Sequence, residues 1–512
     1  MQQEHEHHRL LDLSSHHNQT HDDSSSSFVG QADNSSHHHH HHQPITTTPK
    51  YTRRQQDRTT QPSLWNTKEF YVYYLVFMFC IPYMFRTAHD ASSVDNPNYE
   101  KYQHLLSDGF FGYKLDNSDG QWRGFRNNLP TLLIVVSIYI PLSHLFTAFF
   151  VPSKTTNSLK SPQQPLVRTY FFLAFSAIYL YFMYGNSILK IMLIVSTNYA
   201  IAKLGRNARW MPVATWAFNI AILFLNEGYK GYNFSDVHEA LTWLDDNTGM
   251  DRRWDVHFNF TMLRLVSYNL DYYWSFNSDH ELALEDRDRT PSNDKERVSQ
   301  PAFAGDYCFT YYVAFALYAP LYVAGPIMTF NDFISQLRYP KTIPTKTLLM
   351  WVARLIFSLL TMEFVNHYMY MVAISKTQAW DDDTILQIAM IALFNLVLIW
   401  LKLLIIWRFF RLWALLDGIE APENMIRCWG SWPYYRHLCA VGAVGNILLM
   451  ITANLVGFCT GLEGTKMLIA EMFSSTQGYI TLLGCLGAIF VCAQIQFEVR
   501  ESEKRRGLFL NC

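Results

Sequence analysis

The sequence predicts an all-α membrane protein, in which a polytopic helical bundle of about ten spans follows a polar N-terminal tail. Only 16% of the 512 residues are charged and 49% are hydrophobic, whereas soluble domains average about 25% charged residues. The polar and apolar residues are segregated along the chain, and the apolar ones form long runs. A bilayer core about 30 Å thick requires roughly 20 apolar helical residues, which several runs supply.

The first part of the chain, residues 1–66, is a low-complexity segment rich in His, Ser, Gln, Thr and Asp. With so few apolar residues it buries too little surface to offset the entropy of ordering, so we expect a disordered cytosolic tail. The run His37–His42 could bind metal or could be an affinity tag, but a compositional repeat is the favoured interpretation. Residues 67–512 are predicted to form the membrane domain.

Ten apolar runs define the expected spans, with an uncertainty of about two because short runs can be re-entrant. The first five are Phe70–Phe85, Leu129–Val151, Tyr170–Tyr184, Ser187–Ala202 and Trp210–Leu225. The other five are Cys308–Gly325, Leu348–Ile374, Ile385–Trp407, Leu438–Cys459 and Ile480–Ile495.

Basic residues alternate between the loops and predict that both termini are cytosolic. They precede the first run, separate the second from the third, and follow the fourth and the last: Arg53, Arg54, Arg58, Lys68, Lys154, Lys160, Arg168, Lys203, Arg206, Arg209, Arg500, Lys504, Arg505 and Arg506. The loop after the first run is acidic instead, with Asp90, Asp95, Glu100, Asp108, Asp116 and Asp119.

Composition excludes other classes of protein. The 41 basic and 43 acidic residues nearly cancel, so the chain lacks the basic footprint of a nucleic-acid-binding domain. Eight Cys without a CxxC pair argue against a zinc ribbon or a disulfide-dense scaffold. We predict no metal site, although Asp381–Asp383 could hold a hard cation, because a solvated loop is the favoured interpretation.

Ionisable and polar residues inside predicted spans are candidate functional groups, because they are costly in lipid. They are Lys190, Arg354, Glu363, His367, Asn395 and Lys402. Glu363 and His367 are spaced i,i+4 and share a helix face, so the carboxylate could orient the imidazole as a general base. The favoured alternative is a hydrogen-bonded pair that links helices.

The segment Arg253–Trp274 mixes Arg, Asp and Asn with aromatic residues and predicts a half-buried element at the membrane interface. This segment, together with Pro320–Asn331, Trp407–Ile419 and Pro422–Cys428, resembles the membrane-bound O-acyltransferase (MBOAT) family. The similarity continues from Tyr435-Arg436-His437 through Ala453–Cys459 to Phe497–Glu501. The closer likeness is to the fungal glycerol-uptake-protein (Gup) branch, relatives of Hedgehog acyltransferase.

The resemblance implies a multi-pass protein of the endoplasmic reticulum membrane, with the plasma membrane as a second compartment. It implies transfer of an acyl chain from acyl-CoA to a hydroxyl acceptor, here a GPI-type lipid. GPI-anchor remodelling and a link to glycerol uptake follow from the same branch. The implied partners are membrane lipids rather than nucleic acid, and no tightly bound cofactor is implied.

The chain departs from the family pattern between Cys428 and Trp429. There the family continues into a Trp-His-Arg-Ser-Tyr-Asn-like segment and a later Trp-His-Asp-like motif that carries the catalytic histidine, and neither occurs in this sequence. His437 belongs to the retained downstream motif, so the weak catalytic candidate is His367 with Glu363. We therefore expect the chain to be inactive as written, through a skipped exon in the gene model or a shortened isoform. The alternatives are a small-polyol transporter and a non-catalytic membrane scaffold.

The charge pattern generates a test of orientation. In sealed microsomes, a protease should remove an epitope placed at residue 30, because the basic flanks hold the tail in the cytosol. An epitope in the acidic loop, after Asp95, is the control and should be protected. Protection of the epitope at residue 30 would reverse the assignment.

Overall fold

The computed structural model describes residues 62–150, 166–236, 238–276, 291, 294–423 and 435–506. The chain divides into the units Met1–Thr59 and Thr60–Cys512, and all of these residues lie in the second. The predicted tail therefore lies outside the described residues up to residue 61. The Cys428–Trp429 junction also lies outside them.

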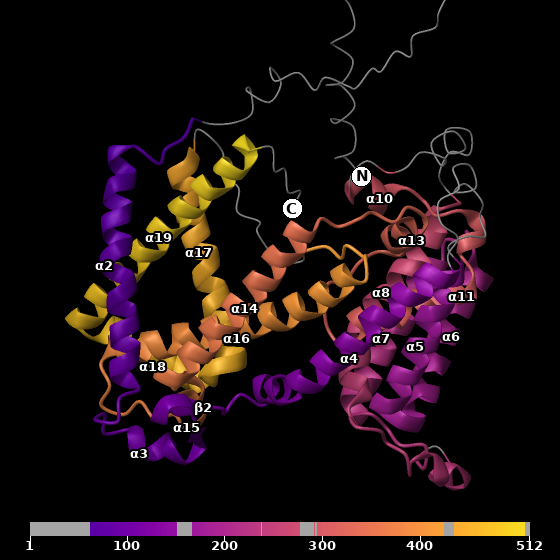
Figure 1. Cartoon of the computed structure of the whole chain (residues 1–512). Coiled ribbons are helices and arrows are strands. Elements are labelled where there is room, and N and C mark those ends of the chain that lie inside the picture. The colour runs from indigo at the N-terminus through magenta and orange to yellow at the C-terminus, as the bar shows by residue number, and fades with distance from the viewer. Residues whose placement is uncertain are drawn as a thin grey trace, which may run out of the picture. The chain divides into compact units, whose positions relative to one another are not determined.

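Long helices dominate the described part of the chain (Figure 1). They are α2 (Lys68–Ala91), α4 (Gly120–Phe150), α5 (Leu166–Tyr184), α6 (Ile188–Gly205), α7 (Met211–Tyr229), α8 (Trp254–Trp274), α14 (Thr345–Tyr368), α16 (Ile385–Leu416), α17 (Arg436–Asn454), α18 (Gly461–Ser474) and α19 (Thr476–Arg505). Short helices are α3 (Tyr99–Tyr102), α10 (Asp294–Ser299), α11 (Phe309–Ala316), α12 (Ala319–Tyr322), α13 (Phe330–Arg338) and α15 (Met371–Thr377). Single turns are η1 (Gln103–Leu105), η2 (Phe110–Gly112), η3 (Gly185–Ser187), η4 (Glu239–Leu244), η5 (Ala304–Asp306) and the π-type η7 (Leu455–Cys459). Strands β1 (Leu106–Asp108) and β2 (Lys114–Asp116) pair antiparallel, with Ser107 opposite Leu115.

The all-α, polytopic fold class predicted from the sequence is confirmed. Seven stretches of the described residues are long and apolar enough to cross a membrane: Lys68–Ala91, Gly120–Phe150, Val167–Gly205, Thr345–Tyr368, Ile385–Leu416, Arg436–Gly457 and Thr476–Arg505. The difference from the ten expected runs has physical causes. Val167–Gly205 contains two runs, which η3 separates where Gly185 takes φ +54°. Helix α7 is diluted by Asn219, Asn226 and Glu227, and the run Cys308–Gly325 is broken into α11 and α12.

Helix α8 packs with one side into the protein, and the membrane-interface position expected for it stays a prediction. Over half of its residues are buried, among them Trp254, Leu265 and Tyr268, and it packs against α6, α7, α11 and α13. Its buried polar residues have protein partners, as the amide of Asn269 shows by donating to Thr215 Oγ1 at 2.9 Å. The other side of the helix is exposed and carries Val256, Phe260, Leu263 and Trp274.

The break between α11 and α12 is closed by a buried arginine of α8. Backbone polar groups that leave a helix inside a bundle need new partners, because no water satisfies them there. The Arg264 guanidinium donates to the carbonyl of Ala316 at 3.4 Å and also to that of Leu321. Arg264 is 2% exposed, so this side chain replaces part of the missing helical ladder.

A second buried charge, Asp417, gathers side chains from several elements directly after α16. Its carboxylate accepts hydrogen bonds from Tyr139 at 2.9 Å and Ser143 at 2.5 Å, both on α4, and from Tyr318 between α11 and α12. Arg168 on α5 supplies the counter-charge, with Nη2 3.2 Å from Oδ1. The Asp417 side chain is fully buried, so every one of these contacts forms away from water.

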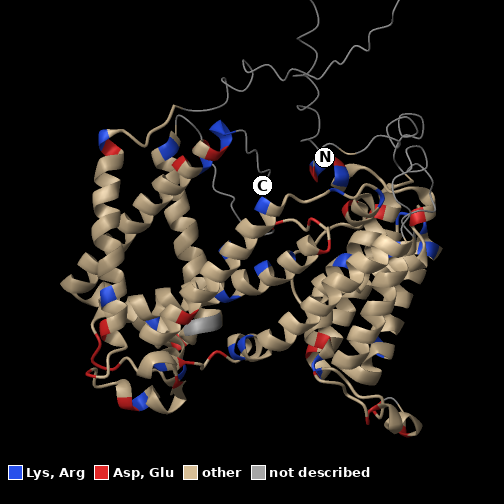
Figure 2. Cartoon of the chain, in the orientation of Figure 1, with Lys and Arg blue, Asp and Glu red and all other residues tan. Residues whose placement is uncertain are grey.

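Charged groups gather near the ends of the helices and in the loops (Figure 2). The acidic loop after α2 folds into α3, η1 and the small sheet. In it, Asp116 Oδ2 accepts the backbone N–H groups of Val372 and Ala373 at 3.0 Å. Burial raises the pKa of the Asp116 carboxyl, and these hydrogen bonds oppose the rise. The loop is thereby fixed to α15.

The Asp417 cluster generates a stability prediction. Asp417→Asn should lower the free energy of unfolding by about 3–5 kcal/mol, because Arg168 would remain buried without a counter-charge. The measurement is the apparent melting temperature of the protein purified in detergent. Asp90→Asn removes an exposed partner of Arg86, whose side chain is 81% exposed, and is the control that should leave melting unchanged. Equal melting of the two variants would contradict the prediction.

Candidate functional site

A small open pocket of about 20 Å³ lies between α14, α16 and the segment that follows α12. Its walls combine indole rings, guanidinium groups and one carboxylate: Pro326, Trp351, Leu404, Trp407, Arg408, Arg411 and Glu423. Helices α14 and α16 pack along each other, and the apolar runs of both helices fix this pairing. Five of the seven lining residues thus come from this pair of helices, and Pro326 and Glu423 come from the segments after α12 and α16.

Guanidinium groups in and beside the pocket contact an indole ring, a backbone carbonyl and a hydroxyl. The Arg411 guanidinium carbon lies 4.1 Å from the centroid of the Trp351 ring, and that of Arg354 lies 4.8 Å from it. Arg411 Nε donates to the Ala421 carbonyl at 2.8 Å, and Arg408 Nη1 donates to Ser358 Oγ at 2.7 Å. Cation–π contacts of this kind stabilise by up to about 2 kcal/mol when desolvated.

Sequence analysis singled out Arg354 and missed Trp351, Arg408 and Arg411 as a site. Arg408 and Arg411 are spaced i,i+3 near the end of α16, which was a usable signal. The sequence analysis assigns both residues only to the family motif Trp407–Ile419. The contact of Arg411 with Trp351 and that of Arg408 with Ser358 depend on how α14 and α16 pack, which the spacing alone does not specify.

Glu363 and His367 lie on one face of α14, as predicted, but the carboxylate does not orient the imidazole. Glu363 instead pairs with Arg126 of α4, with Oε1 to Nε at 2.6 Å and Oε2 to Nη2 at 3.1 Å. The same carboxylate stands 3.9 Å from His367 Nδ1. The pair thus links α14 to α4 through Arg126, a residue that sequence analysis did not single out.

Both ring nitrogens of His367 are engaged by backbone groups. Nδ1 lies 2.6 Å from the Glu363 carbonyl, and Nε2 accepts the N–H of Phe110 at 3.1 Å. The imidazole is 7% exposed and stacks on the Phe110 ring. A methyl group at Gly109 would lie 2.6 Å from Nε2, so the neighbouring chain fits closely around the ring. This geometry fixes η2 on α14 and leaves no lone pair for an acceptor proton.

The remaining predicted polar residues are each satisfied separately. Lys190 donates to the Tyr232 carbonyl at 2.6 Å, Asn395 to the Met371 carbonyl at 3.0 Å, and Lys402 to Asp119 Oδ2 at 2.6 Å. They belong to three different contacts and form no common site.

The acidic triplet Asp381–Asp383 is held by protein contacts. Asp381 pairs with Lys101 at 2.7 Å, and Asp383 accepts from Asn96 at 3.0 Å. Burial raises the pKa of the Asp383 carboxyl. Among the described residues, no group of three or more His, Cys, Asp or Glu side chains is placed to hold a metal ion.

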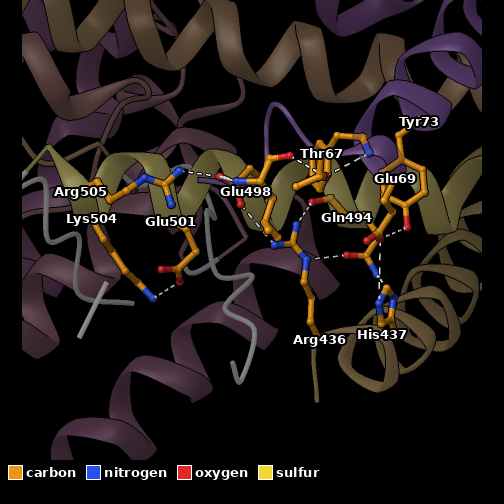
Figure 3. A network of polar contacts seen from close by, with 12 residues as sticks. Thr67, Glu69, Tyr73, Arg436, His437, Gln494, Glu498, Glu501, Lys504 and Arg505 are labelled. Carbon is orange, nitrogen blue, oxygen red and sulfur yellow. Dashed lines mark hydrogen bonds and ion pairs between the residues drawn. The ribbon is translucent and has the colours of Figure 1, made fainter. Parts of the chain in front are cut away.

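His437 lies in a polar network that joins the beginnings of α2 and α17 to the end of α19 (Figure 3). Its Nδ1 is 3.1 Å from Gln494 Nε2, and its side chain is 66% exposed. The centre of the network is Glu498, which is fully buried and accepts from Arg505 Nη2 at 2.5 Å and from Arg436 Nη1 at 3.2 Å. The network binds helices together and contains no pocket among those described.

The fold and these sites define a polytopic helical membrane protein with polar groups held between its helices. The model of the MBOAT, membrane-bound O-acyltransferase family, matches residues 243–438. The membrane-bound O-acyltransferase GUP1 of Candida tropicalis is 37% identical over 540 residues, covering 88% of this chain and 90% of the relative. GUP1 of Saccharomyces cerevisiae is 36% identical, covering 90% and 96%, and gup1 of Schizosaccharomyces pombe is 32% identical, covering 88% and 92%.

The chain therefore belongs to the membrane-bound O-acyltransferase family, in its fungal Gup branch. The similarity to the Candida relative extends over 540 positions, yet 88% of this chain is only about 450 residues. About 90 positions of that alignment consequently lie opposite gaps in this chain.

The ion pair between α4 and α14 generates a stability prediction. Glu363→Ala should reduce accumulation of the protein in membranes, because Arg126 would lose its bidentate partner in a low-dielectric bundle. The double variant Glu363→Ala/Arg126→Ala should recover part of the loss, since neither charge then remains unpaired. The measurement is the amount of monodisperse protein in detergent for each variant. Recovery no better than the single variant would show that the pair is not coupled.

Proposed function

We propose that this chain is an O-acyltransferase homologue that keeps the membrane body of its family but does not transfer acyl groups as written. The observation that carries the proposal is the set of about 90 alignment positions for which this chain has no counterpart. The absence of both Trp-His-containing motifs from the sequence is consistent with a loss at the Cys428–Trp429 junction. General-base catalysis requires a base within hydrogen-bond reach of the acceptor hydroxyl.

Two described histidines, His367 and His437, support the proposal by their surroundings. His367 uses both ring nitrogens on backbone groups, so accepting a proton would require it to give up the Phe110 N–H. His437 is exposed within the network around Glu498 and is not among the residues that line the pocket at Trp351. Neither histidine meets a substrate cavity among those described.

For the intact family member, the proposed process is acyl remodelling of GPI-type lipids in the endoplasmic reticulum membrane, with a link to glycerol uptake. Acyl-CoA would be the donor and a lipid hydroxyl the acceptor. Both molecules carry hydrocarbon chains, so a helical bundle is a suitable scaffold on which to bring them together. Membrane-spanning candidates on both sides of the junction, α16 and α17, support retention of that scaffold here.

A non-catalytic scaffold role is the second candidate, and the missing alignment positions favour it too. A chain that keeps α16 before the junction and the α17–α19 segment after it retains surfaces for lipids or membrane partners without needing a catalytic base. The two candidates differ in whether restoring the family segment creates activity.

The test compares this chain with a form that carries the family segment between Cys428 and Trp429. Both are purified in detergent and supplied with labelled acyl-CoA and a lyso-lipid acceptor. We expect product from the restored form alone, because a general base contributes about 10²–10⁴-fold.

A restored form with its catalytic histidine changed to Ala is the negative control. Comparable product from the present chain and the restored form would overturn the proposal and direct attention to His367 and His437. Failure of the restored form would favour the scaffold role.

A further inference from the structure

The hairpin of β1 and β2 ends in an aromatic tip, residues 109–113, with the sequence Gly-Phe-Phe-Gly-Tyr. Phe110 is 60% exposed, Phe111 98% and Tyr113 48%. Large apolar side chains scattered singly over a surface need no explanation, whereas several gathered in one place mark an interaction site. The aromatic tip gathers three of them within one turn, and Phe111 is the most exposed.

The turn itself does not favour a phenylalanine at position 111. Tyr113 N–H donates to the Phe110 carbonyl at 3.1 Å, which closes a four-residue turn. Phe111 has φ 57° and ψ 24°, and Gly112 has φ 82°. Two successive left-handed residues define a type I′ turn, whose central positions favour Asn, Asp and Gly. A bulky side chain is disfavoured in this conformation, so the fold alone does not account for the ring.

The aromatic tip has a fixed position against the last turn of α14. Phe110 N–H donates to His367 Nε2 at 3.1 Å, and the Phe110 ring stacks on the imidazole with the centroids 5.6 Å apart. The Tyr113 ring lies 5.0 Å from the Tyr368 ring, and strand β2 packs against α14. These contacts hold the tip in place and leave the Phe111 ring outside them.

The exposed apolar face of α14 leads to the aromatic tip. Helix α14 is a candidate membrane span, and its residues Phe357, Leu360 and Phe364 are 72%, 64% and 57% exposed. Their spacing of three and four residues places them on one helix face. The Phe364 ring lies 4.7 Å from the Tyr368 ring, which contacts Tyr113 in turn. In a membrane, an exposed apolar face of a spanning helix lies against lipid, and the tip continues this face.

Charged side chains stand directly behind the aromatic tip. Asp108 of β1 and Lys114 of β2 are opposite each other in the sheet, and their side chains pair at 2.6 Å. These side chains are 92% and 49% exposed. The hairpin therefore changes from charged to aromatic between this residue pair and the turn. Such an order is typical of a segment that extends from water into the membrane interface.

We propose that the aromatic tip inserts into the membrane interface beside α14, with the Phe111 ring among phospholipid chains and the Asp108–Lys114 pair in water. Burial of the ring in lipid offsets the unfavourable backbone conformation of the turn. Through Phe110, the same insertion holds the acidic loop and its contact with His367 at the membrane surface. The inference requires no acyl transfer and goes beyond the proposed function.

The test measures whether lipid covers position 111 in the full chain, reconstituted into phosphatidylcholine nanodiscs. Both membrane faces of a nanodisc are accessible from water, and no other membrane protein is present. Phe111→Cys and its matched control Asp108→Cys are labelled with a membrane-impermeant maleimide. Residues 102–114 contain no native Cys, follow a Lys and end with one. Trypsin therefore releases both positions in one peptide, on which mass spectrometry measures the label.

We expect Phe111→Cys to react at least about tenfold more slowly than Asp108→Cys, because a thiol in an apolar medium forms little of the reactive thiolate. The two variants should react alike once SDS has dissolved the nanodisc and unfolded the chain. Similar rates in the nanodisc would overturn the proposal, because the fold by itself leaves both positions open. Slow labelling of Phe111→Cys that persists in SDS would also reject it, since lipid then does not cause the difference.

A second variant keeps an aromatic ring and identifies what covers it. Phe111→p-benzoylphenylalanine is irradiated in native membranes, and the adducts of the chain are analysed by mass spectrometry. We expect a phospholipid adduct at position 111. An adduct with another protein, or the absence of a lipid adduct, would overturn the proposal. Because the ring is retained, this measurement remains decisive even where Phe111→Cys does not fold.

Discussion

A charge buried between membrane helices must find its partners within the protein. Asp417 meets this requirement through contacts that connect α4, α5 and α16. Its carboxylate accepts hydrogen bonds from Tyr139 on α4 and from Tyr318 between α11 and α12, and Arg168 on α5 supplies the counter-charge. The Asp417 backbone carbonyl also accepts from Arg168. The chain then turns at Gly418, with φ +82°, a conformation that favours glycine. The direction in which the chain leaves α16 is thereby set.

The pocket at Trp351 depends on that direction. After the turn, Ile419 N–H donates back to the Ala414 carbonyl at 2.9 Å, and Ala421 presents the carbonyl that holds Arg411 Nε. Arg411 in turn lies over Trp351 of α14. A contact made by the carboxylate with α4 and α5 thus positions a guanidinium of α16 against α14. Phe171 and Phe175 of α5 pack against both of the large clusters of buried apolar residues, and both rings contact Tyr139, the Asp417 partner on α4.

Local pattern was enough to predict the helices but not their partners. The apolar runs placed α2, α4, α14, α16 and α19, because a span requires a length that the sequence displays. The break in Cys308–Gly325 escaped prediction because Arg264, which closes it, lies about 50 positions earlier on α8. The i,i+4 spacing of Glu363 and His367 correctly placed them on one helix face. Glu363 nevertheless forms its ion pair with Arg126, 237 positions away. Spacing specifies neighbours along a helix, whereas the choice among competing partners is settled by packing between helices.

The described helices before and after the Cys428–Trp429 junction are anchored by separate sets of contacts. On the earlier side, Arg411 fixes the chain as far as Ala421. On the later side, Arg436 at the first position of α17 donates to Gln494 Oε1 at 2.7 Å and to Glu498. Glu498 also accepts the N–H of Leu64 before α2 at 3.0 Å, so α17 begins against the first and last of the described long helices (Figure 3). Because neither set of contacts uses residues at the junction, the described helices on its two sides are anchored independently of it.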